Sequence, residues 1–390
     1  MYIAHSLPDR DILQRVGLQI AAHALEHDRD KTLDRVSWDA LTQANLWRIS
    51  VAPEYGGLGL TWKTCVECID EVARHCEDLG FLITMLGHVG SIKLLNDYGT
   101  PEQKDRWIPR LLQGEIAVTA MTESTGGSDL SKMRLSAVKT PDGYQINGRK
   151  RHITNSPVAT MGMIAGRMAD LPDKKDITLF FLDFNQAGIS IGEEEDNLGI
   201  RTSPTADIQF ECTPISAVNV VGTAGDGLSI LYRIISFEHA LYGVIAAGLI
   251  DGIAAKGMQR VTEQEAFGKP LADFQYIQAR LSDMKMGAVI CRTLAYESLK
   301  LLDTEDSQAS IVCSVTKFQA GESLFKAAED IVQIYGHQGF MNNTISKYLR
   351  DASGMRIAGG TSDIQRINIF NQMRRQAKAG SVSAPYGCST

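Results

Sequence analysis

The chain has 390 residues, of which 39 are basic and 46 acidic, so its formal net charge at pH 7 is -7. This mildly acidic balance argues against a nucleic-acid partner, since nucleic-acid binding needs a basic surface. The seven cysteines are irregularly spaced and no secretory leader is recognisable, which predicts a reducing, cytoplasmic location. The longest mostly apolar stretch, Gly243–Ala255, is interrupted by Asp251 and is too short to span a bilayer, so we expect no membrane segment.

The length allows two or three packed units, and the first of these is predicted to be helical. Between Asp9 and Glu115, apolar residues recur at spacings of three and four, as in the stripe Ile12, Val16 and Ile20. This spacing is typical of amphipathic helices. We therefore predict an N-terminal helical domain over residues 1–115.

The pattern changes near Ile116, where short β-prone runs alternate with turn signals. The dipeptides Asp142-Gly143 and Asn147-Gly148 are typical of hairpin turns. Such spacing favours a small β-barrel or sandwich over alternating strands and helices. We predict a central β domain over residues 116–225.

Helical periodicity returns after the glycine-rich segment Gly222–Gly227. It predicts a C-terminal helical bundle over residues 226–378, followed by a tail at 379–390. The predicted fold class is therefore α+β, mostly α. The helices expected in the bundle are Leu228–Glu263, Leu271–Leu302, Gln308–Tyr335 and Thr361–Ala377.

Six short motifs carry most of the functional information. Any one of them is weak evidence, since a polar Gly/Ser turn is common in proteins. Together, in this order, they resemble the acyl-CoA dehydrogenase family between Pro53 and Met373. The motifs are Ala120–Asp129 (AMTESTGGSD), Gly148–Asn155 (GRKRHITN), Leu198–Thr205 (LGIRTSPT), Phe267–Gln275 (FGKPLADFQ), Gln333–Phe340 (QIYGHQGF) and Arg350–Arg366 (RDASGMRIAGGTSDIQR).

The resemblance implies FAD, bound noncovalently between a helical domain, a β domain and a four-helix bundle, in a homodimer or homotetramer. It also implies which residues bind the cofactor. Those on the β domain are Thr119, Met121, Thr122, Ser128, His152, Ile153 and Thr154. Gln264, Phe267 and Gln275 follow on the C-terminal part, and a second subunit's FAD would be met by Gln333, Ile334, Tyr335 and Gly336. Thr361 and Asp363 would lie near the pyrophosphate and ribose.

Five positions depart from the family pattern, four of which are described first. Gly359 stands where most members carry the glutamate that removes the substrate α-proton. His152 replaces an aromatic residue, and His337 replaces the second glycine of a Gly-Gly pair. Gln264 replaces an arginine that contacts the FAD pyrophosphate across the subunit interface, so we expect weaker FAD binding unless Arg260 substitutes for it.

The missing base has a candidate in Glu238, which lies in the apolar helix segment SFEHALYGVIAAG. A lone glutamate on a helix is by default a surface residue. However, isovaleryl-CoA and long-chain acyl-CoA dehydrogenases carry their base at this helix position. The prolyl-carrier-protein dehydrogenases resemble the chain at both places. The implied substrate-binding residues are Ser128, Ser236, His239, Gly359 and Gly360, with His239 standing where an arginine is usual.

The predicted function is FAD-dependent α,β-desaturation of an acyl thioester on coenzyme A or on a carrier protein, with electron-transfer flavoprotein or oxygen as acceptor. A flavin-dependent monooxygenase on the same scaffold is the alternative, because such relatives lack the usual glutamate. A catalytically silent FAD-binding subunit is a third hypothesis. We expect no metal, because the spacing of Cys65 and Cys68 on a helix, without a second matched pair, indicates buried thiols.

Overall fold

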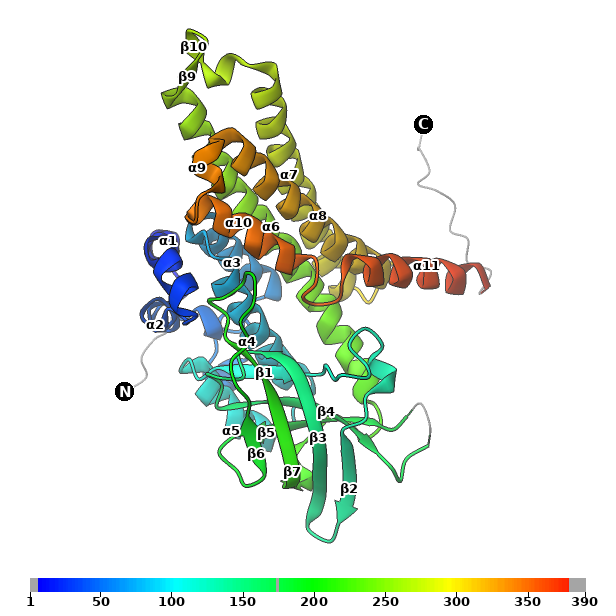
Figure 1. The fold of residues 1–390 in the computed structure, drawn as a ribbon. Coiled ribbons are helices and arrows are strands. Elements are labelled where there is room, and N and C mark those ends of the chain that lie inside the picture. Colours follow the sequence, from blue (N-terminus) through cyan, green and yellow to red (C-terminus); the bar gives the residue numbers. More distant parts are fainter. Residues whose placement is uncertain (1–5, 173–174, 379–390) are drawn as a thin grey trace.

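The computed structural model describes residues 6–172 and 175–378, so the tail predicted at 379–390 lies outside the described residues. Figure 1 shows an upper bundle of long helices, a lower sheet, and the N-terminal helices beside the junction of the two. The predicted order of a helical unit, a β unit and a helical bundle is confirmed.

Five helices make up the N-terminal unit. Each is preceded by an Asp or Thr whose side chain accepts a hydrogen bond from the first helical turn, which explains where the helices begin. Four of them present one apolar face to the core, whereas the helix at 79–98 is buried on most sides. The helices are α1 (Arg10–Asp30), α2 (Arg35–Gln43), α3 (Trp62–Cys76), α4 (Leu79–Tyr98) and α5 (Pro101–Leu112).

The central unit is one mixed sheet of eight strands in the order β6-β7-β3-β2-β4-β5-β8, with β1 paired in parallel to β4. The predicted hairpin turn at Asp142-Gly143 joins β2 to β3. The turn predicted at Asn147-Gly148 is wrong, because both residues lie inside β3. The strands are β1 (Ala117–Ala120), β2 (Ser136–Thr140), β3 (Gly143–Thr154), β4 (Met161–Met168), β5 (Ile177–Asp183), β6 (Ile189–Ile191), β7 (Thr205–Ser216) and β8 (Val220–Val221).

The bundle contains α6 (Gly227–Glu263), α7 (Gln275–Asp303), α8 (Ala309–Tyr335), α9 (His337–Phe340), α10 (Thr344–Met355) and α11 (Ser362–Lys378). The helix predicted to begin at Leu271 begins at Gln275, because residues 271–273 form a 3₁₀ turn. A short hairpin of β9 (Glu265–Ala266) and β10 (Lys269–Pro270) precedes that turn.

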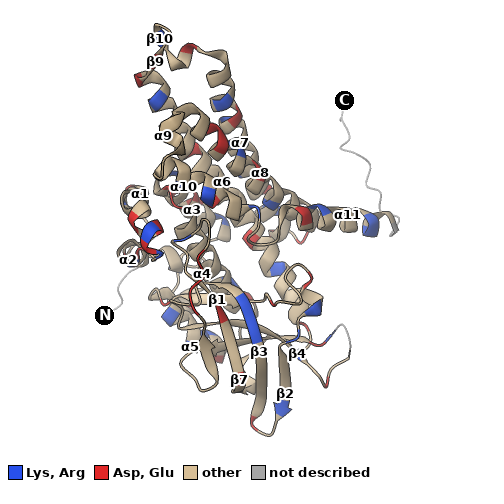
Figure 2. Cartoon of the chain, in the orientation of Figure 1, with Lys and Arg blue, Asp and Glu red and all other residues tan. Residues whose placement is uncertain are grey.

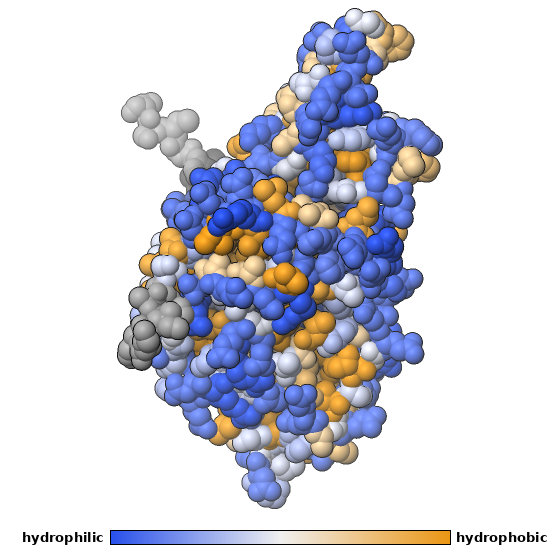
Figure 3. Space-filling view, turned by 90° about the vertical axis from the view of Figure 1, so that its left-hand side faces the viewer, coloured by the Kyte–Doolittle hydropathy of each residue, from blue (hydrophilic) through white to orange (hydrophobic). Residues whose placement is uncertain are grey.

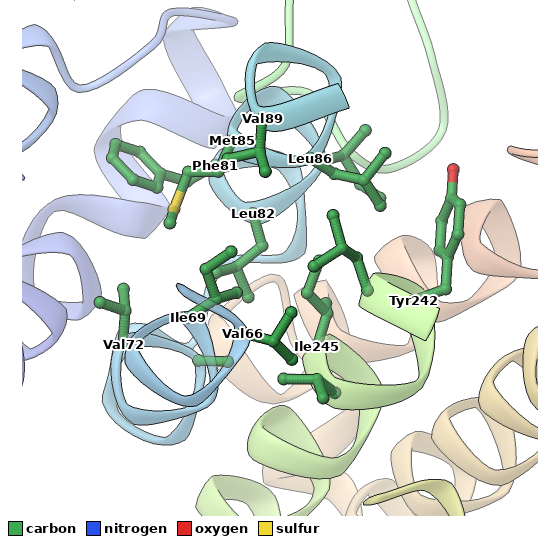
Figure 4. Close-up of a cluster of buried hydrophobic side chains, with 14 of the residues drawn as sticks. Val66, Ile69, Val72, Phe81, Leu82, Met85, Leu86, Val89, Tyr242 and Ile245 are labelled. Atoms are coloured by element: carbon green, nitrogen blue, oxygen red, sulfur yellow. The ribbon is translucent and has the colours of Figure 1, made fainter. Parts of the chain in front are cut away.

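Helix α6 holds the three units together. Its apolar side chains pack with those of α3 and α4 in a shared core, where Val66, Leu82, Leu86 and Ile245 lie around a common centre and Tyr242 stands at the edge (Figure 4). By length and composition α4 and α6 resemble membrane-spanning helices, but 83% of each apolar window is buried inside the protein. Core helices of this kind are weak evidence for a membrane segment.

The Arg350-Asp351 pair at the start of the last motif has a structural role. The buried Lys347 ammonium lies between Asp351, at 2.6 Å, and Asp78 at the start of α4, at 3.1 Å. Asp351 also accepts the backbone N–H of Ile200, and Arg350 pairs with Asp28 of α1. These contacts connect α10 to the N-terminal helices and to the loop before β7.

Candidate active site

Glu238 lies in the first half of α6 and is only 7% exposed. Among the described residues, no group donates a hydrogen bond to its carboxylate. Burial without a compensating cation raises the pKa of Glu238 to about 8. The surface-residue interpretation is therefore wrong, and the side chain is a desolvated carboxyl group able to accept a proton near neutral pH.

Two glycines of α4 place Glu238 beside the end of β3. A Cβ added to Gly90 would lie 2.5 Å from Glu238 Oε1, and one added to Gly87 would lie 3.4 Å from Asn155 Nδ2. Residues three apart on a helix are separated by about 4.5 Å along its axis. Asn155 also donates through Nδ2 to the carbonyl oxygens of Thr84 and Ala117, which fixes the strand end against α4. The Thr154-Asn155 end of β3 and the Glu238 carboxyl are thus neighbours across one turn of α4.

Gly359 and Gly360 form the turn between α10 and α11, with φ angles of +67° and +93°. His239 donates from Nε2 to the Gly359 carbonyl oxygen at 3.1 Å, and Gln365 donates to the Gly360 carbonyl oxygen at 3.2 Å. Burial, with the nearby charge of Lys317, lowers the pKa of His239 to about 3. The lowered pKa and the hydrogen bond to the Gly359 carbonyl oxygen favour a neutral His239 that donates to the turn.

The turn brings Gly359 and Glu238 to the same region of α6, because His239, which holds the turn, follows Glu238 directly. Three residues of this region were missed by the sequence argument: Gly90, Tyr242 and Lys317. Tyr242 had a signal, since it stands four residues after Glu238 and must share its helix face. No sequence signal pointed to Gly90 or Lys317, because their contacts are made with other helices.

The motif Ala120–Asp129 forms the loop after β1, and a buried ion pair shapes it. Lys150 Nζ lies 2.7 Å from Glu123 Oε1, and the same carboxylate accepts the backbone N–H groups of Arg134 and Leu135. The loop also lies against β3, where the Arg151 N–H donates to the Thr122 carbonyl oxygen. Burial lowers the pKa of Lys150 to about 8. This pair orders the loop, so its other side chains stay available.

The β-domain residues implied for the flavin carry unused hydrogen-bonding groups. Thr119, Thr122 and Thr154 are half-buried, Ser128 is exposed, and none of their hydroxyls bonds to a described residue. Uncharged donors and acceptors in a partly buried position fit a flavin ring, whose edge carries carbonyl oxygens and nitrogens. Ile153 is different, since its side chain packs into the core of the sheet. Only its backbone can meet a ring on the opposite face.

His152 is exposed and adopts a φ of +56°, unusual for a residue with a side chain. Its Nδ1 lies 2.7 Å from Glu195, so the acidic run at 193–196 is partly anchored. Its backbone N–H donates to Asp207, which also pairs with Arg149 and Arg151. Figure 2 shows this basic band on β3 beside an acidic stretch of β7. Arg149 and Arg151 balance the charge of Asp207. The group formed by His152, Glu195 and Asp207 is therefore part of an ion-pair network that needs no metal ion.

The cofactor residues implied between Gln264 and Gly336 lie at the far end of the bundle, away from the sheet (Figure 1). Phe267, at the tip of the β9–β10 hairpin, is 96% exposed. Nearby, the Arg260 guanidinium lies 5.1 Å from the Tyr335 ring, its Nε is buried without a partner, and no described carboxylate pairs with it. Of the other implied residues at this end, Ile334 is buried, whereas the exposed ones are Gln264, Gln275, Gln333 and Gly336.

Three implied residues near the turn make local contacts instead. The Thr361 hydroxyl accepts the N–H of Ile364 and begins α11, and Asp363 pairs with Arg366. The Ser236 hydroxyl donates to the Tyr232 carbonyl oxygen. These contacts leave Asp363 exposed beside the turn and occupy the Ser236 donor.

Comparison with known proteins agrees with this arrangement. Models of the N-terminal, middle and C-terminal domains of the acyl-CoA dehydrogenases match residues 13–115, 118–213 and 225–373. A mitochondrial 2-methylacyl-CoA dehydrogenase of Solanum tuberosum is 30% identical over 91% of this chain and 86% of its own length. A cyclohex-1-ene-1-carbonyl-CoA dehydrogenase of Syntrophus aciditrophicus is 29% identical over 90% of this chain and 84% of its own.

Among solved structures, the prolyl acyl carrier protein oxidase AnaB superposes with a TM-score of 0.89. It is 24% identical, with 93% of this chain and 97% of that chain covered, so it establishes the shared fold. The three domain matches, the 30% identical relative and a buried carboxyl group beside unused flavin-type donors agree. The chain therefore belongs to the acyl-CoA dehydrogenase family and is an FAD-dependent oxidoreductase that acts on acyl thioesters.

Proposed function

We propose that Glu238 is the base that removes the α-proton of the acyl thioester. The observation that carries the proposal is a buried carboxyl group with no hydrogen-bond partner in the described chain and a pKa raised to about 8 by burial. A desolvated carboxylate is a stronger base, and its raised pKa suits proton transfer near neutral pH. Gly359 has no side chain that could share this role.

The Gly359–Gly360 turn supplies a second element of the reaction. The backbone N–H groups of Gly359 and Gly360 donate to no described group, and both lie at the surface of the turn. We propose that this turn hydrogen-bonds the thioester carbonyl oxygen. Donors placed there stabilise the enolate-like charge that grows as the α-proton leaves. His239 and Gln365 hold the turn by its carbonyl oxygens, which leaves its N–H groups without a partner among the described residues.

The residues present fit FAD at both of its ends. The free hydroxyls of Thr119, Thr122 and Thr154 would hold the ring, and Arg260 would meet the pyrophosphate of FAD held by a second copy of the chain. When bound, FAD supplies the acceptor for the β-hydride. The protein's own groups take the proton, polarise the carbonyl and orient the acyl group.

We propose a homodimer or homotetramer as the working assembly. Large exposed apolar side chains gather on three elements, and monomeric proteins rarely expose such groups together. Figure 3 shows apolar side chains scattered over one side of the molecule and at the tip that carries the β9–β10 hairpin. The exposed residues are Phe267 and Tyr276 near the hairpin, Met286, Val289 and Ile290 on α7, and Ile367, Phe370 and Met373 on α11.

We propose that the acyl group is carried by coenzyme A or by the phosphopantetheine arm of a carrier protein. The relatives' names include acyl-CoA dehydrogenases, and the neighbour AnaB is named for an acyl carrier protein substrate. Electron-transfer flavoprotein and oxygen are the two proposed acceptors. The described cysteines form no disulfide, which is in keeping with the proposed cytoplasmic location.

The test is anaerobic reduction of the bound flavin. The purified holoprotein is mixed with a panel of acyl-CoA and acyl-carrier-protein thioesters, and the flavin absorbance is followed. A dehydrogenase loses the absorbance with at least one thioester and no added reductant. If no thioester bleaches the flavin and an external reductant is needed, the monooxygenase function replaces the proposal.

A further inference from the structure

Tyr242 occupies the space in which a side chain at position 359 would lie. A Cβ added to Gly359 would be 2.5 Å from Tyr242 Cε2 and 2.8 Å from both Cζ and the hydroxyl oxygen. Real Cβ atoms do not approach ring atoms this closely. Gly359 also has a φ of +67°, which residues with side chains rarely adopt. The glycine and the tyrosine are therefore a mutually dependent pair.

The Tyr242 ring is held in place on several sides. It is 3% exposed and belongs to the core shared by α3, α4 and α6, at the edge of which it stands in Figure 4. On another side, Lys317 Nζ lies 4.7 Å from the ring centroid and donates to the Met355 carbonyl oxygen at 2.8 Å. A cation over an aromatic face favours one ring position. The ring is thus a fixed part of this region.

Tyr242 and Glu238 face the same side of α6. They are four residues apart, so their side chains are neighbours on the helix surface. Among the described residues, neither the Tyr242 hydroxyl nor the Glu238 carboxylate has a hydrogen-bond partner. A carbon that loses its proton to Glu238 must lie within about 3 Å of the carboxylate. The acyl atoms that follow it then meet the next side chain on this face, which is Tyr242.

We propose that Tyr242 is a specificity-determining residue, which forms the wall of the acyl site on the Gly359 side and restricts the site to compact acyl groups. The inference rests on the proposed function, because it requires a thioester in front of Glu238. It also accounts for the position of the base. A glutamate at 359 would collide with the Tyr242 ring, so moving the carboxylate there by Glu238→Gly with Gly359→Glu requires a smaller residue at 242.

The experiment measures binding, with β-thia acyl thioesters in which sulfur replaces the β-carbon so that no β-hydride can leave. A short and a long analogue, on coenzyme A and on an acyl carrier protein, are titrated into wild-type, Tyr242→Ala and Tyr242→Phe holoprotein by calorimetry. We expect Tyr242→Ala to shift the affinity ratio toward the long analogue by about tenfold or more, since pocket methylenes are worth this much. Tyr242→Phe keeps the ring and should leave the ratio unchanged.

An unchanged ratio in folded, FAD-loaded Tyr242→Ala would overturn the inference while leaving the proposed function intact. Failure of the wild type to bind any thioester would instead count against the proposed function. If Tyr242→Ala does not fold, Tyr242→Leu takes its place, with a shift in the same direction expected.

A second arm tests the pairing without any ligand. Gly359→Ala should lower the thermal midpoint of the wild type, and lower it less in the Tyr242→Ala background, because the ring that it strikes is gone. Gly360→Ala is the matched control, since Gly360 also has a positive φ but its Cβ would meet Gln365 instead. Its effect should be equal in both backgrounds. Equal effects for Gly359→Ala as well would contradict the pairing.

Discussion

Glu238 and Arg260 stand on the same helix, α6, about 33 Å apart along its axis. Around Glu238 lie Gly90 of α4, Tyr242 of α6 and, held by the adjacent His239, the Gly359 turn. Around Arg260 the chain supplies an aromatic face and an exposed hairpin, but no carboxylate among the described residues.

This difference indicates which end of the FAD and substrate site a single chain can form without a second copy. The base end is enclosed, so its chemistry depends on packing within one subunit. The Arg260 end is a surface with an unpaired cation and a fully exposed Phe267. A cavity of about 350 Å³, lined by Met258 and Leu281 among others, lies at this end and not at Glu238. We therefore interpret the Arg260 end as the part that a second copy and its FAD complete.

The largest effect is expected at the enclosed end. Glu238→Gln should keep the fold, the FAD and thioester binding, while flavin reduction falls by about a hundredfold to ten-thousandfold, because an amide cannot take the α-proton. Anaerobic stopped-flow absorbance measures the rate. Glu297→Gln, at an exposed position of α7, is the control and should reduce at the wild-type rate. Wild-type reduction by Glu238→Gln would remove Glu238 from the mechanism.

The next effect concerns the exposed end. Phe267→Ser should lower both the oligomeric state and the FAD content, because an exposed ring at an interface is a binding hot spot. Light scattering at micromolar concentration and the flavin-to-protein absorbance ratio measure the two. Val138→Ser removes an exposed apolar side chain from the sheet and should change neither. A monomer with full FAD would show that the Arg260 end needs no second copy.

Arg260→Gln should weaken FAD binding by about tenfold to a hundredfold, the worth of a charge-assisted hydrogen bond. Gln264→Arg should add little to the wild type but restore binding in the Arg260→Gln background, because one cation suffices for the pyrophosphate. FAD dissociation constants from fluorescence titration distinguish these cases. The exposed Arg29 gives a neutral control as Arg29→Gln. Unchanged FAD affinity in Arg260→Gln would show that Arg260 does not replace the pyrophosphate contact that Gln264 lacks.

The smallest effect is the pH dependence of reduction. Glu238 is protonated below its pKa of about 8 and acts as a base only when ionised. The second-order rate of flavin reduction should therefore rise with pH and level off above about 8, with roughly a tenfold gain over pH 7. A reduction rate that does not change from pH 6 to 9 would contradict the raised pKa. It would mean that a further group, not among the neighbours of Glu238 described above, stabilises the ionised carboxylate.

Much of this could be predicted from the sequence because its signals are local. Hydrophobic spacing gave the helical and β units, and the motif order gave the family and FAD. The resemblance to isovaleryl-CoA and long-chain acyl-CoA dehydrogenases identified Glu238 as the candidate base, whereas a lone glutamate on a helix would by default be a surface residue. The local turn signal at Asn147-Gly148 was misleading. Residues before and after this dipeptide pair with β7, so the dipeptide forms an irregularity within β3 and no turn.

Only the tertiary structure decided what surrounds these residues. Three contacts join segments that are 75 or more residues apart in sequence: Gly359 with Tyr242, His239 with the Gly359 carbonyl oxygen, and Arg260 with the Tyr335 ring. Such contacts depend on how α6, α8 and the α10–α11 turn pack, and spacing along one helix carries no information about them. The residue types were determined by the sequence, whereas their burial, their pKa values and their partners were determined by the packing.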